Sequence, residues 1–244
     1  MKIDVLTLFP GMFDGVMSES MMWKARDRGL LDFQVCDIRD FARDKHRQVD
    51  DTPYGGGGGM ILKPDVLVRA IESVKGDADA PVILLSPQGR KLTHAVAAEL
   101  SRLPRLILVC GHYEGIDERV RQLAISDEIS IGDYVLTGGE LAAMVLIDAV
   151  ARLIPGVLGA AGAQDRDSHA DGLLEGPHYT RPPEFRGLGV PDVLTSGHHA
   201  EVERWRRRGA LKRTWQRRPD MLASAALSDD DRAYLAQLGA GKAD

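Results

Sequence analysis

Short apolar runs that are typical of buried strands alternate with helix-like segments through the first 153 residues of this 244-residue chain. The strand-like runs cover residues 2–8, 33–38, 82–85, 106–110 and 129–136. Helical patterns cover residues 12–27, 65–74, 93–102, 115–123 and 140–153. This alternation predicts a layered α/β domain around a mostly parallel sheet.

The last of these helices, residues 140–153, is apolar on nearly every side, so we expect it to be buried or to form an interface. Beyond Pro155 the chain changes character, because residues 156–171 are rich in Gly, Ala and Asp and lack an apolar period. Such a composition indicates a linker or a mobile loop.

The rest of the chain predicts a small, mainly helical region. Proline-rich turns around residues 181–183 precede a basic helix near residues 199–208 and a final helix near residues 229–238. We therefore expect three parts: an α/β domain at residues 1–158, a linker at 159–171 and a C-terminal domain at 172–244.

Composition indicates a cytoplasmic protein with no place in a membrane. Hydrophobic residues make up 44% of the chain and charged residues 27%, as in ordinary soluble domains. The longest strongly apolar run, residues 141–147, is too short to span a bilayer, and no secretory signal is evident. Cys36 and Cys110 both lie in apolar stretches, which favours two buried thiols over a disulfide or a metal site.

Charge is distributed unevenly. The chain has a net charge of −5, yet residues 201–218 hold eight Lys or Arg and only two Glu. Trp205 and Trp215 lie within this basic stretch, and basic residues interleaved with aromatic ones suit phosphate contact and base stacking. A solvated helix face is the usual alternative, but the excess of positive charge favours RNA binding.

Three glycine-containing segments stand at the ends of predicted strands, at residues 85–89, 110–117 and 131–140. In open α/β sheets, ligands bind beyond the carboxyl ends of the strands, where glycine lets a ligand approach the backbone. The three segments together predict a pocket walled by backbone. None of them is a dinucleotide fingerprint or a Walker A loop, which argues against NAD and ATP.

With residues 50–57 and 176–182, these segments resemble the bacterial tRNA (guanine-N1)-methyltransferase family, from Ile3 to about Leu227. The resemblance implies a SPOUT-type α/β domain with a deep trefoil knot, and an obligate homodimer. It implies S-adenosylmethionine as methyl donor and tRNA, rather than DNA, as partner. The methyl acceptor would be N1 of the guanosine that lies 3′ of the anticodon.

The resemblance also implies which residues bind the donor. They are Leu85, Ser86, Pro87, Gly111, Tyr113, Glu114, Ile131, Gly132, Asp133, Tyr134, Val135, Leu136, Gly138 and Gly139. Two positions depart from the family pattern: Gly58 replaces a proline in the glycine loop, and His169 replaces a phenylalanine after the catalytic Asp-Ser pair.

The family's catalytic pair matches Asp167 and Arg152. Guanine N1 carries a proton and is a poor nucleophile, so a carboxylate such as Asp167 is needed to remove it. A guanidinium such as Arg152 would stabilise the negative charge that moves to the exocyclic oxygen. The alternatives are a solvated loop aspartate, with Asp165 close enough to be confused with it, and an arginine that only caps a helix.

Further residues are candidates for RNA contact. The substrate-binding residues we predict are Asp50, Tyr54, Gly57, His178, Arg181, Arg206, Arg207, Arg208, Lys212 and Arg213. The glycine run at 55–59 suits a phosphate cradle as well as a flexible surface loop. His178 and Tyr179 suit stacking on a splayed base, with burial in the small domain as the alternative.

No metal site is assigned, because the sequence has no zinc-type Cys/His spacing and no cluster of oxygen ligands. The magnesium dependence of the family makes Glu114 a candidate for binding substrate or Mg²⁺. Two rival functions stay open: a SPOUT methyltransferase acting on another RNA base or a ribose, and a non-catalytic RNA-binding protein. Asp167 and Arg152 together speak against the second, since a binding protein needs neither.

Overall fold

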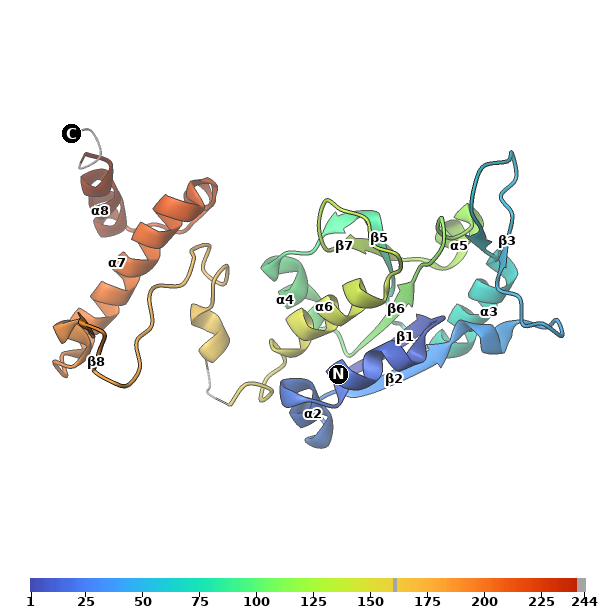
Figure 1. Cartoon of the computed structure of the whole chain (residues 1–244), viewed down its shortest axis with the longest axis horizontal. Helices are drawn as coiled ribbons and strands as arrows, with labels where there is room; N and C mark the ends of the chain where they lie inside the picture. The colour runs from blue at the N-terminus through green and yellow to red at the C-terminus, as the bar shows by residue number, and fades with distance from the viewer. Residues whose placement is uncertain (160–161, 241–244) are drawn as a thin grey trace. The chain divides into compact units, whose positions relative to one another are not determined.

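The computed structural model describes residues 1–159 and 162–240, which form two compact units, Met1–Ala161 and Gly162–Asp244 (Figure 1). The first unit contains the parallel sheet and the second is mainly helical. The α/β class with a helical C-terminal part is thus confirmed. The trefoil knot stays a prediction, as does the assignment of residues 159–171 as a linker.

Five parallel strands build the sheet of the first unit. Their order is β2 (Asp32–Asp37), β1 (Lys2–Thr7), β6 (Arg105–Cys110), β5 (Val82–Lys91) and β7 (Asp127–Ser130). Parallel strands are covered on both faces, so their side chains alternate between two buried layers. In β6, Leu106, Leu108 and Cys110 belong to one apolar cluster, and Ile107 and Val109 belong to the other.

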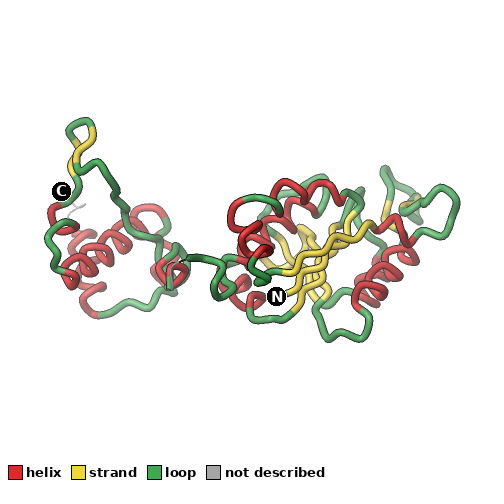
Figure 2. The backbone as a smooth tube through the Cα atoms, turned by 90° about the horizontal axis from the view of Figure 1, so that it is seen from below, coloured by secondary structure: helices red, strands yellow, loops and turns green. Residues whose placement is uncertain are grey.

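Helices cover both faces of this sheet (Figure 2). One apolar cluster includes residues of α2 (Ser20–Asp27), α4 (His94–Ser101) and α6 (Glu140–Ala151). The other includes residues of α3 (Pro64–Lys75) and α5 (Glu118–Ala124). Helix α6 is buried along most of its length, which confirms the prediction from its apolar composition.

Two expectations for the first unit were wrong. The single helix expected over residues 12–27 is η1 (Pro10–Phe13), α1 (Asp14–Met17) and α2, with a break before Ser20, where φ is +50°. The strand expected over residues 129–136 stops at Ser130. The Ser130 hydroxyl donates to the carbonyl of Gly132 and accepts from its amide, so the chain turns out of the sheet there.

Shorter elements complete the first unit. Helix η2 (Ile38–Phe41) follows β2, and the antiparallel pair β3 (Asp50–Asp51) and β4 (Ile61–Leu62) flanks the glycine run at residues 55–59. Strand β5 continues past the predicted residues 82–85, after an irregularity between Leu85 and Arg90. Several glycines of the run have positive φ, a conformation that glycine adopts readily.

The second unit packs around helix α7 (His199–Arg217), which continues well past the predicted end at residue 208. The other elements are η3 (Ala163–Arg166), β8 (Glu184–Phe185), β9 (Leu188–Gly189), η4 (Asp192–Leu194), η5 (Pro219–Ala223) and α8 (Asp229–Ala240). The inner side of α7 buries Val202, Leu211 and Thr214. Within the described residues, no helix combines the length and the apolar character needed to cross a membrane.

Candidate functional site

A pocket opens at the irregularity in β5 after Leu85 and at the ends of β6 and β7, along one edge of the parallel sheet. The loop after β6 and the long loop after β7 form its walls. The lining residues fall in three segments: Leu84 to Gln88, Gly111 to Ile116, and Ser130 to Gly139, with Arg121 and Ala142 beside them. All three segments are those that the glycine pattern singled out.

Glycine is required where the two loops meet. The Gly139 amide donates to the Gly111 carbonyl at 2.8 Å. A Cβ on Gly139 would lie 2.7 Å from Cys110 Cα and 3.0 Å from Gly111 N, and neither backbone atom can move easily. The floor of the pocket is therefore made by backbone in direct contact with backbone.

A buried carboxylate supports this floor from behind. Glu140 is only 2% exposed, and its Oε1 accepts a 2.7 Å hydrogen bond from the Thr7 hydroxyl at the end of β1. The same hydroxyl accepts from the amide of Phe9. Because Glu140 begins α6 directly after Gly138 and Gly139, this contact connects the pocket loop to the end of β1.

Cys110 is confirmed as a buried thiol. Burial and the neighbouring Glu140 raise its pKa well above the ordinary value, so it stays protonated and unreactive. Cys36 is partly buried, and burial together with Asp40 raises its pKa as well. Neither sulfur is in a disulfide.

Most residues predicted to bind the donor line this pocket; the exceptions are Gly132 and Asp133. The Asp133 carboxylate lies in an exposed ion pair with Lys91 at 3.0 Å. The pocket also includes residues that we did not predict, among them Gln88, His112 and Thr137. His112 lies inside the string at residues 110–117, so its place in that string was the available signal. Its ring packs 4.9 Å from the rings of Phe9 and Tyr113.

The two predicted catalytic residues belong to different compact units. Arg152 is the C-terminal cap residue of α6, where its backbone amide donates to the Asp148 carbonyl at 3.2 Å. Asp167 directly follows η3 in the second unit. Their meeting at one reaction centre therefore stays a prediction.

Helix α7 presents cations in two different ways. Arg204, Arg208 and Lys212 are spaced four residues apart and are exposed along one face. Arg207 is half-buried and donates to Asp171 and Asp231. The inner-facing Arg213 donates to the carbonyls of Glu175 and Gly176.

The other predicted RNA contacts are accessible. Tyr54 and the glycine run are exposed, as is Arg181. His178 is exposed and lies 2.7 Å from the Glu175 carboxylate, while Tyr179 packs against Trp205 with ring centroids 6.1 Å apart. Burial, the alternative for His178 and Tyr179, was wrong, because neither side chain is buried.

A parallel sheet with a backbone-walled pocket at its carboxyl edge defines an α/β ligand-binding protein, here joined to a helical unit that carries the basic helix α7. Over residues 1–224 the sequence matches the family described as tRNA (Guanine-1)-methyltransferase TrmD, and the chain belongs to that family.

Named relatives match along nearly their whole length. The tRNA (guanine-N(1)-)-methyltransferase of Dehalococcoides mccartyi is 59% identical over 240 residues, which is 98% of this chain and 97% of that protein. The protein of the same name from Geobacter metallireducens is 57% identical over 242 residues, 99% of each chain. That of Brevibacillus brevis is 57% identical over 238 residues, 98% of each.

Proposed function

We propose that this protein transfers a methyl group from S-adenosylmethionine to N1 of the guanosine 3′ of the anticodon in tRNA. The observation that carries the proposal is the backbone-walled pocket at the carboxyl edge of the sheet, in a chain of this family. The relatives above, similar over nearly their full length, are named for guanine-N1 methylation of tRNA. Because tRNA is the proposed substrate, we place the protein in the cytoplasm.

The pocket residues suit this donor. Leu85, Ile131 and Leu136 supply apolar walls for a flat ring, and the glycine backbone leaves room for it to approach amides and carbonyls. When bound, S-adenosylmethionine supplies an electrophilic methyl group on a positively charged sulfur. Glu114 lines the same pocket and lies beside Gly59, so the glycine run borders the donor site.

Asp167 and Arg152 would carry the chemistry. Asp167 would accept the proton from guanine N1 and so free the N1 lone pair for the methyl group that the donor supplies. Arg152 would stabilise the negative charge that develops on the exocyclic oxygen. A general base and an electrostatic stabiliser are the two aids that this transfer needs.

A magnesium site built by the described residues of one chain does not fit. Among these residues, no three His, Cys, Asp or Glu side chains converge as metal ligands would. Mg²⁺ takes oxygen ligands in octahedral geometry and often shares them with substrate phosphates. We therefore assign no step to Mg²⁺ and leave Glu114 as a substrate-binding candidate.

The tRNA would bind to the exposed cations of α7, to His178 and Arg181, and to the region of Asp50, Tyr54 and Gly57. Of the predicted set, Arg206 is exposed but pairs with Glu203 at 2.8 Å. Arg207 and Arg213 are held by oxygens of their own unit, so Arg208, Lys212 and the neighbouring Arg204 are better placed for phosphates.

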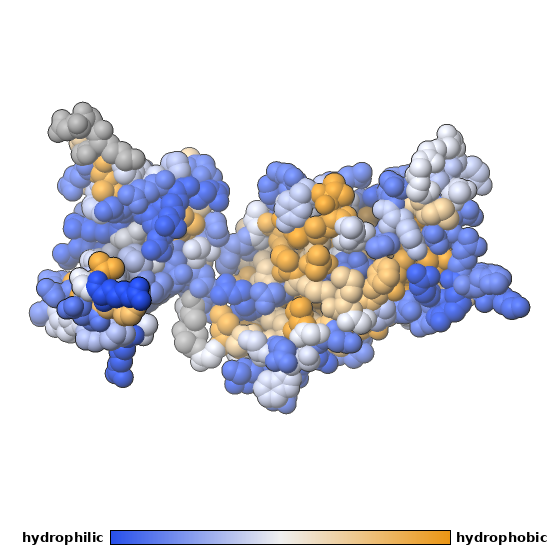
Figure 3. All heavy atoms as spheres, in the orientation of Figure 1, coloured by the Kyte–Doolittle hydropathy of each residue, from blue (hydrophilic) through white to orange (hydrophobic). Residues whose placement is uncertain are grey.

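The protein would act as a homodimer through α6. Leu141 and Val145 are about half exposed, and they lie one helical turn apart, so both are on the same side of this apolar helix. Met12 and Val16 are also exposed. Figure 3 shows hydrophobic surface gathered over α6 and the neighbouring loops of the first unit. Exposed apolar surface of this kind marks interaction sites.

Isotope-labelled donor incubated with unmodified tRNA tests the proposal, with nuclease digestion and mass analysis of the product. We expect one labelled 1-methylguanosine, in the fragment that contains the position 3′ of the anticodon. A label on another base or on a ribose would support the related methyltransferase reading instead. Donor binding without any transfer would support the non-catalytic RNA-binding protein.

A further inference from the structure

We infer that Arg207, which donates to Asp171, acts as a positioning residue for methyl transfer by holding the segment that bears Asp167. The inference rests on the proposed role of Asp167 as the base. It concerns contacts inside the second unit alone. The segment is folded on itself and is bound to α7, and the arginine that binds it is anchored at α8.

The segment from Asp167 to Glu175 is closed by its own hydrogen bonds. The Ala170 amide donates to the Asp167 carbonyl at 3.1 Å, and the His169 amide donates to the Leu173 carbonyl at 2.8 Å. The Glu175 amide donates to the Ser168 hydroxyl oxygen at 3.0 Å. A displacement of Asp171 or Leu173 is therefore transmitted directly to the backbone of Asp167.

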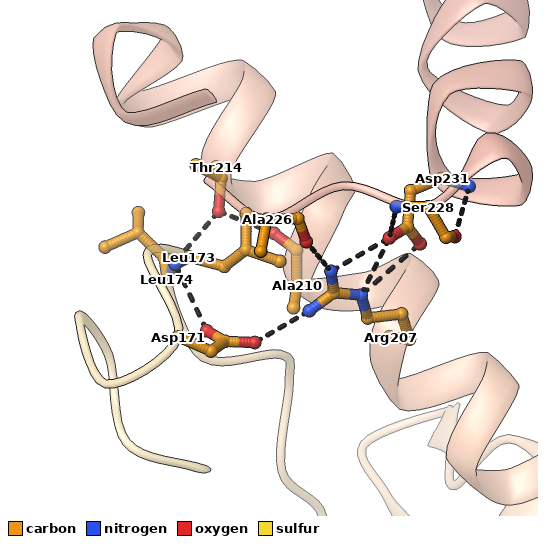
Figure 4. Close-up of polar contacts among 9 residues, drawn as sticks. All are labelled: Asp171, Leu173, Leu174, Arg207, Ala210, Thr214, Ala226, Ser228 and Asp231. Carbon is orange, nitrogen blue, oxygen red and sulfur yellow. Dashed lines mark hydrogen bonds and ion pairs between the residues drawn. The ribbon is translucent and has the colours of Figure 1, made fainter. Parts of the chain in front are cut away.

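Two contacts fix this closed segment to α7 (Figure 4). Arg207 Nη1 donates to Asp171 Oδ2 at 2.7 Å. The Leu174 amide donates to the Thr214 hydroxyl oxygen at 2.8 Å, and that hydroxyl donates in turn to the Ala210 carbonyl. Between these two contacts Leu173 is fully buried, so the segment is held by packing as well as by polar bonds.

The same guanidinium is anchored on its other side by the start of α8. Arg207 Nη2 donates to Asp231 Oδ2 at 2.9 Å and to the Ala226 carbonyl at 3.1 Å. Asp231 is only 9% exposed, and it accepts from the Ser228 amide while its own amide donates to the Ser228 hydroxyl, in the arrangement of a capping box. A planar guanidinium can donate to all of these separated acceptors at once, whereas the single ammonium group of a lysine cannot.

The contact of Arg207 with Asp171 differs from its contact with Asp231 in what it can contribute. The Asp171 carboxylate is 52% exposed, and an ion pair with so much solvent contact adds little to stability. It does fix where the segment lies. A base must be within hydrogen-bond reach of the proton it removes, so a small displacement of Asp167 slows the transfer strongly.

Asp171→Asn is the decisive variant. The asparagine keeps an oxygen that can accept from the Leu173 amide, as Asp171 Oδ1 does at 3.2 Å, but loses the acceptor for Arg207. At saturating donor we expect the single-turnover rate to fall about 3- to 5-fold, the range that loss of one half-exposed ion pair allows. The dissociation constants for donor and tRNA and the melting temperature should stay near wild-type values. Arg207→Lys, which keeps the charge, should show the same loss of rate.

Asp231→Asn is the matched control, because it cuts the other anchor of the same guanidinium. It should lower the melting temperature while the rate, measured well below melting, falls much less than in Asp171→Asn. A normal single-turnover rate in Asp171→Asn would overturn the inference. Losses of rate in both variants that simply follow their losses of stability would also overturn it.

Asp167→Asn, measured in parallel, separates this inference from the proposed function. If the single-turnover rate is low in Asp167→Asn but normal in Asp171→Asn, Asp167 is the base and the positioning role of Arg207 is wrong. If the rate is normal in Asp167→Asn, Asp167 is not the base, and the inference about Arg207 that depends on it is also wrong.

Discussion

Asp165 and Asp167 lie two residues apart at the end of η3, and only one of them can be the base. We expect Asp167→Asn to lower the single-turnover rate by about 10²–10⁴-fold, because the amide cannot accept the N1 proton. Donor affinity should hardly change. Asp165→Asn should be much milder, and rapid-quench kinetics with labelled donor measures both. A collapse confined to Asp165→Asn would move the base two residues upstream.

Gly139 gives a second prediction at the scale of one residue. In Gly139→Ala the new methyl group would press on Cys110 Cα and Gly111 N, so the loops that form the pocket floor must separate. We expect donor affinity to fall at least about tenfold and stability to fall by roughly 1–3 kcal/mol. Calorimetric titration and thermal melts measure the two effects. Gly15→Ala is the control, since nothing lies within 4 Å of its added Cβ, and both quantities should stay near wild type.

The sequence predicted the pocket segments because three glycine-containing segments stand at strand ends, and parallel strands bring those ends together at one edge of the sheet. It did not predict the contacts of Arg207 within the second unit, since the sequence suggested only contact with tRNA. A run of three arginines does not reveal which of them faces the interior, and the partners Asp171 and Asp231 lie far away in the sequence. His169 is similar: its φ of +78° belongs to the closed segment, and the sequence showed only a departure from the family pattern.

At the scale of elements, α7 separates an outer basic face from an inner packed one. Replacing Arg204, Arg208 and Lys212 together with Ala should weaken tRNA binding and flatten its salt dependence. Each lost phosphate contact should reduce the slope by roughly 0.7–0.9. Filter binding over a salt series measures this. The unfolding temperature should change little. If tRNA affinity stays normal across the salt series, this face of α7 does not contact tRNA and is only a solvated surface.

The stability that the Arg207–Asp231 contact between α7 and α8 contributes should depend on pH. The hydrogen bond from Arg207 holds the pKa of Asp231 below its ordinary value of 3.8. A carboxyl with a lowered folded-state pKa contributes stability that is complete above the ordinary value and is lost as pH falls through the lowered one. Urea unfolding between pH 6 and pH 3 should show this loss in the wild type. Asp231→Asn should be less stable at pH 6 and show a smaller decline.

Elements were predicted correctly where periodicity reflects burial, as in β1, β6 and α6. The strand expected through Leu136 failed for a physical reason. Tyr134, Val135 and Leu136 are apolar and adjacent like strand residues, yet all three are exposed and line the pocket. An apolar run that lines a pocket has the same sequence pattern as a buried strand, so periodicity alone cannot distinguish the two.

At the scale of the whole molecule, each unit has its own packed interior, and the family match spans most of both. Packing within the first unit leaves one apolar face of α6 exposed. Leu141 and Val145, at 51% and 48% exposed, lie on a helix whose other side chains are largely buried. Stable dimers bury on the order of 1,200–2,000 Å², which a helix face with flanking residues such as Met12 and Val16 can supply.

We expect the wild type to sediment as a dimer at micromolar concentration and Leu141→Arg/Val145→Arg to sediment as a monomer. Both positions are solvent-exposed in the single chain, so arginine there costs the monomer little, whereas in a dimer it would bury charge in an apolar contact. Leu123→Arg, on α5 and 74% exposed, is the matched control and should stay dimeric. A wild type that sediments as a monomer, or an unchanged dimer in the double variant, would remove α6 from the interface. If the double variant is a monomer with a normal thermal melt, the apolar face of α6 serves association rather than folding.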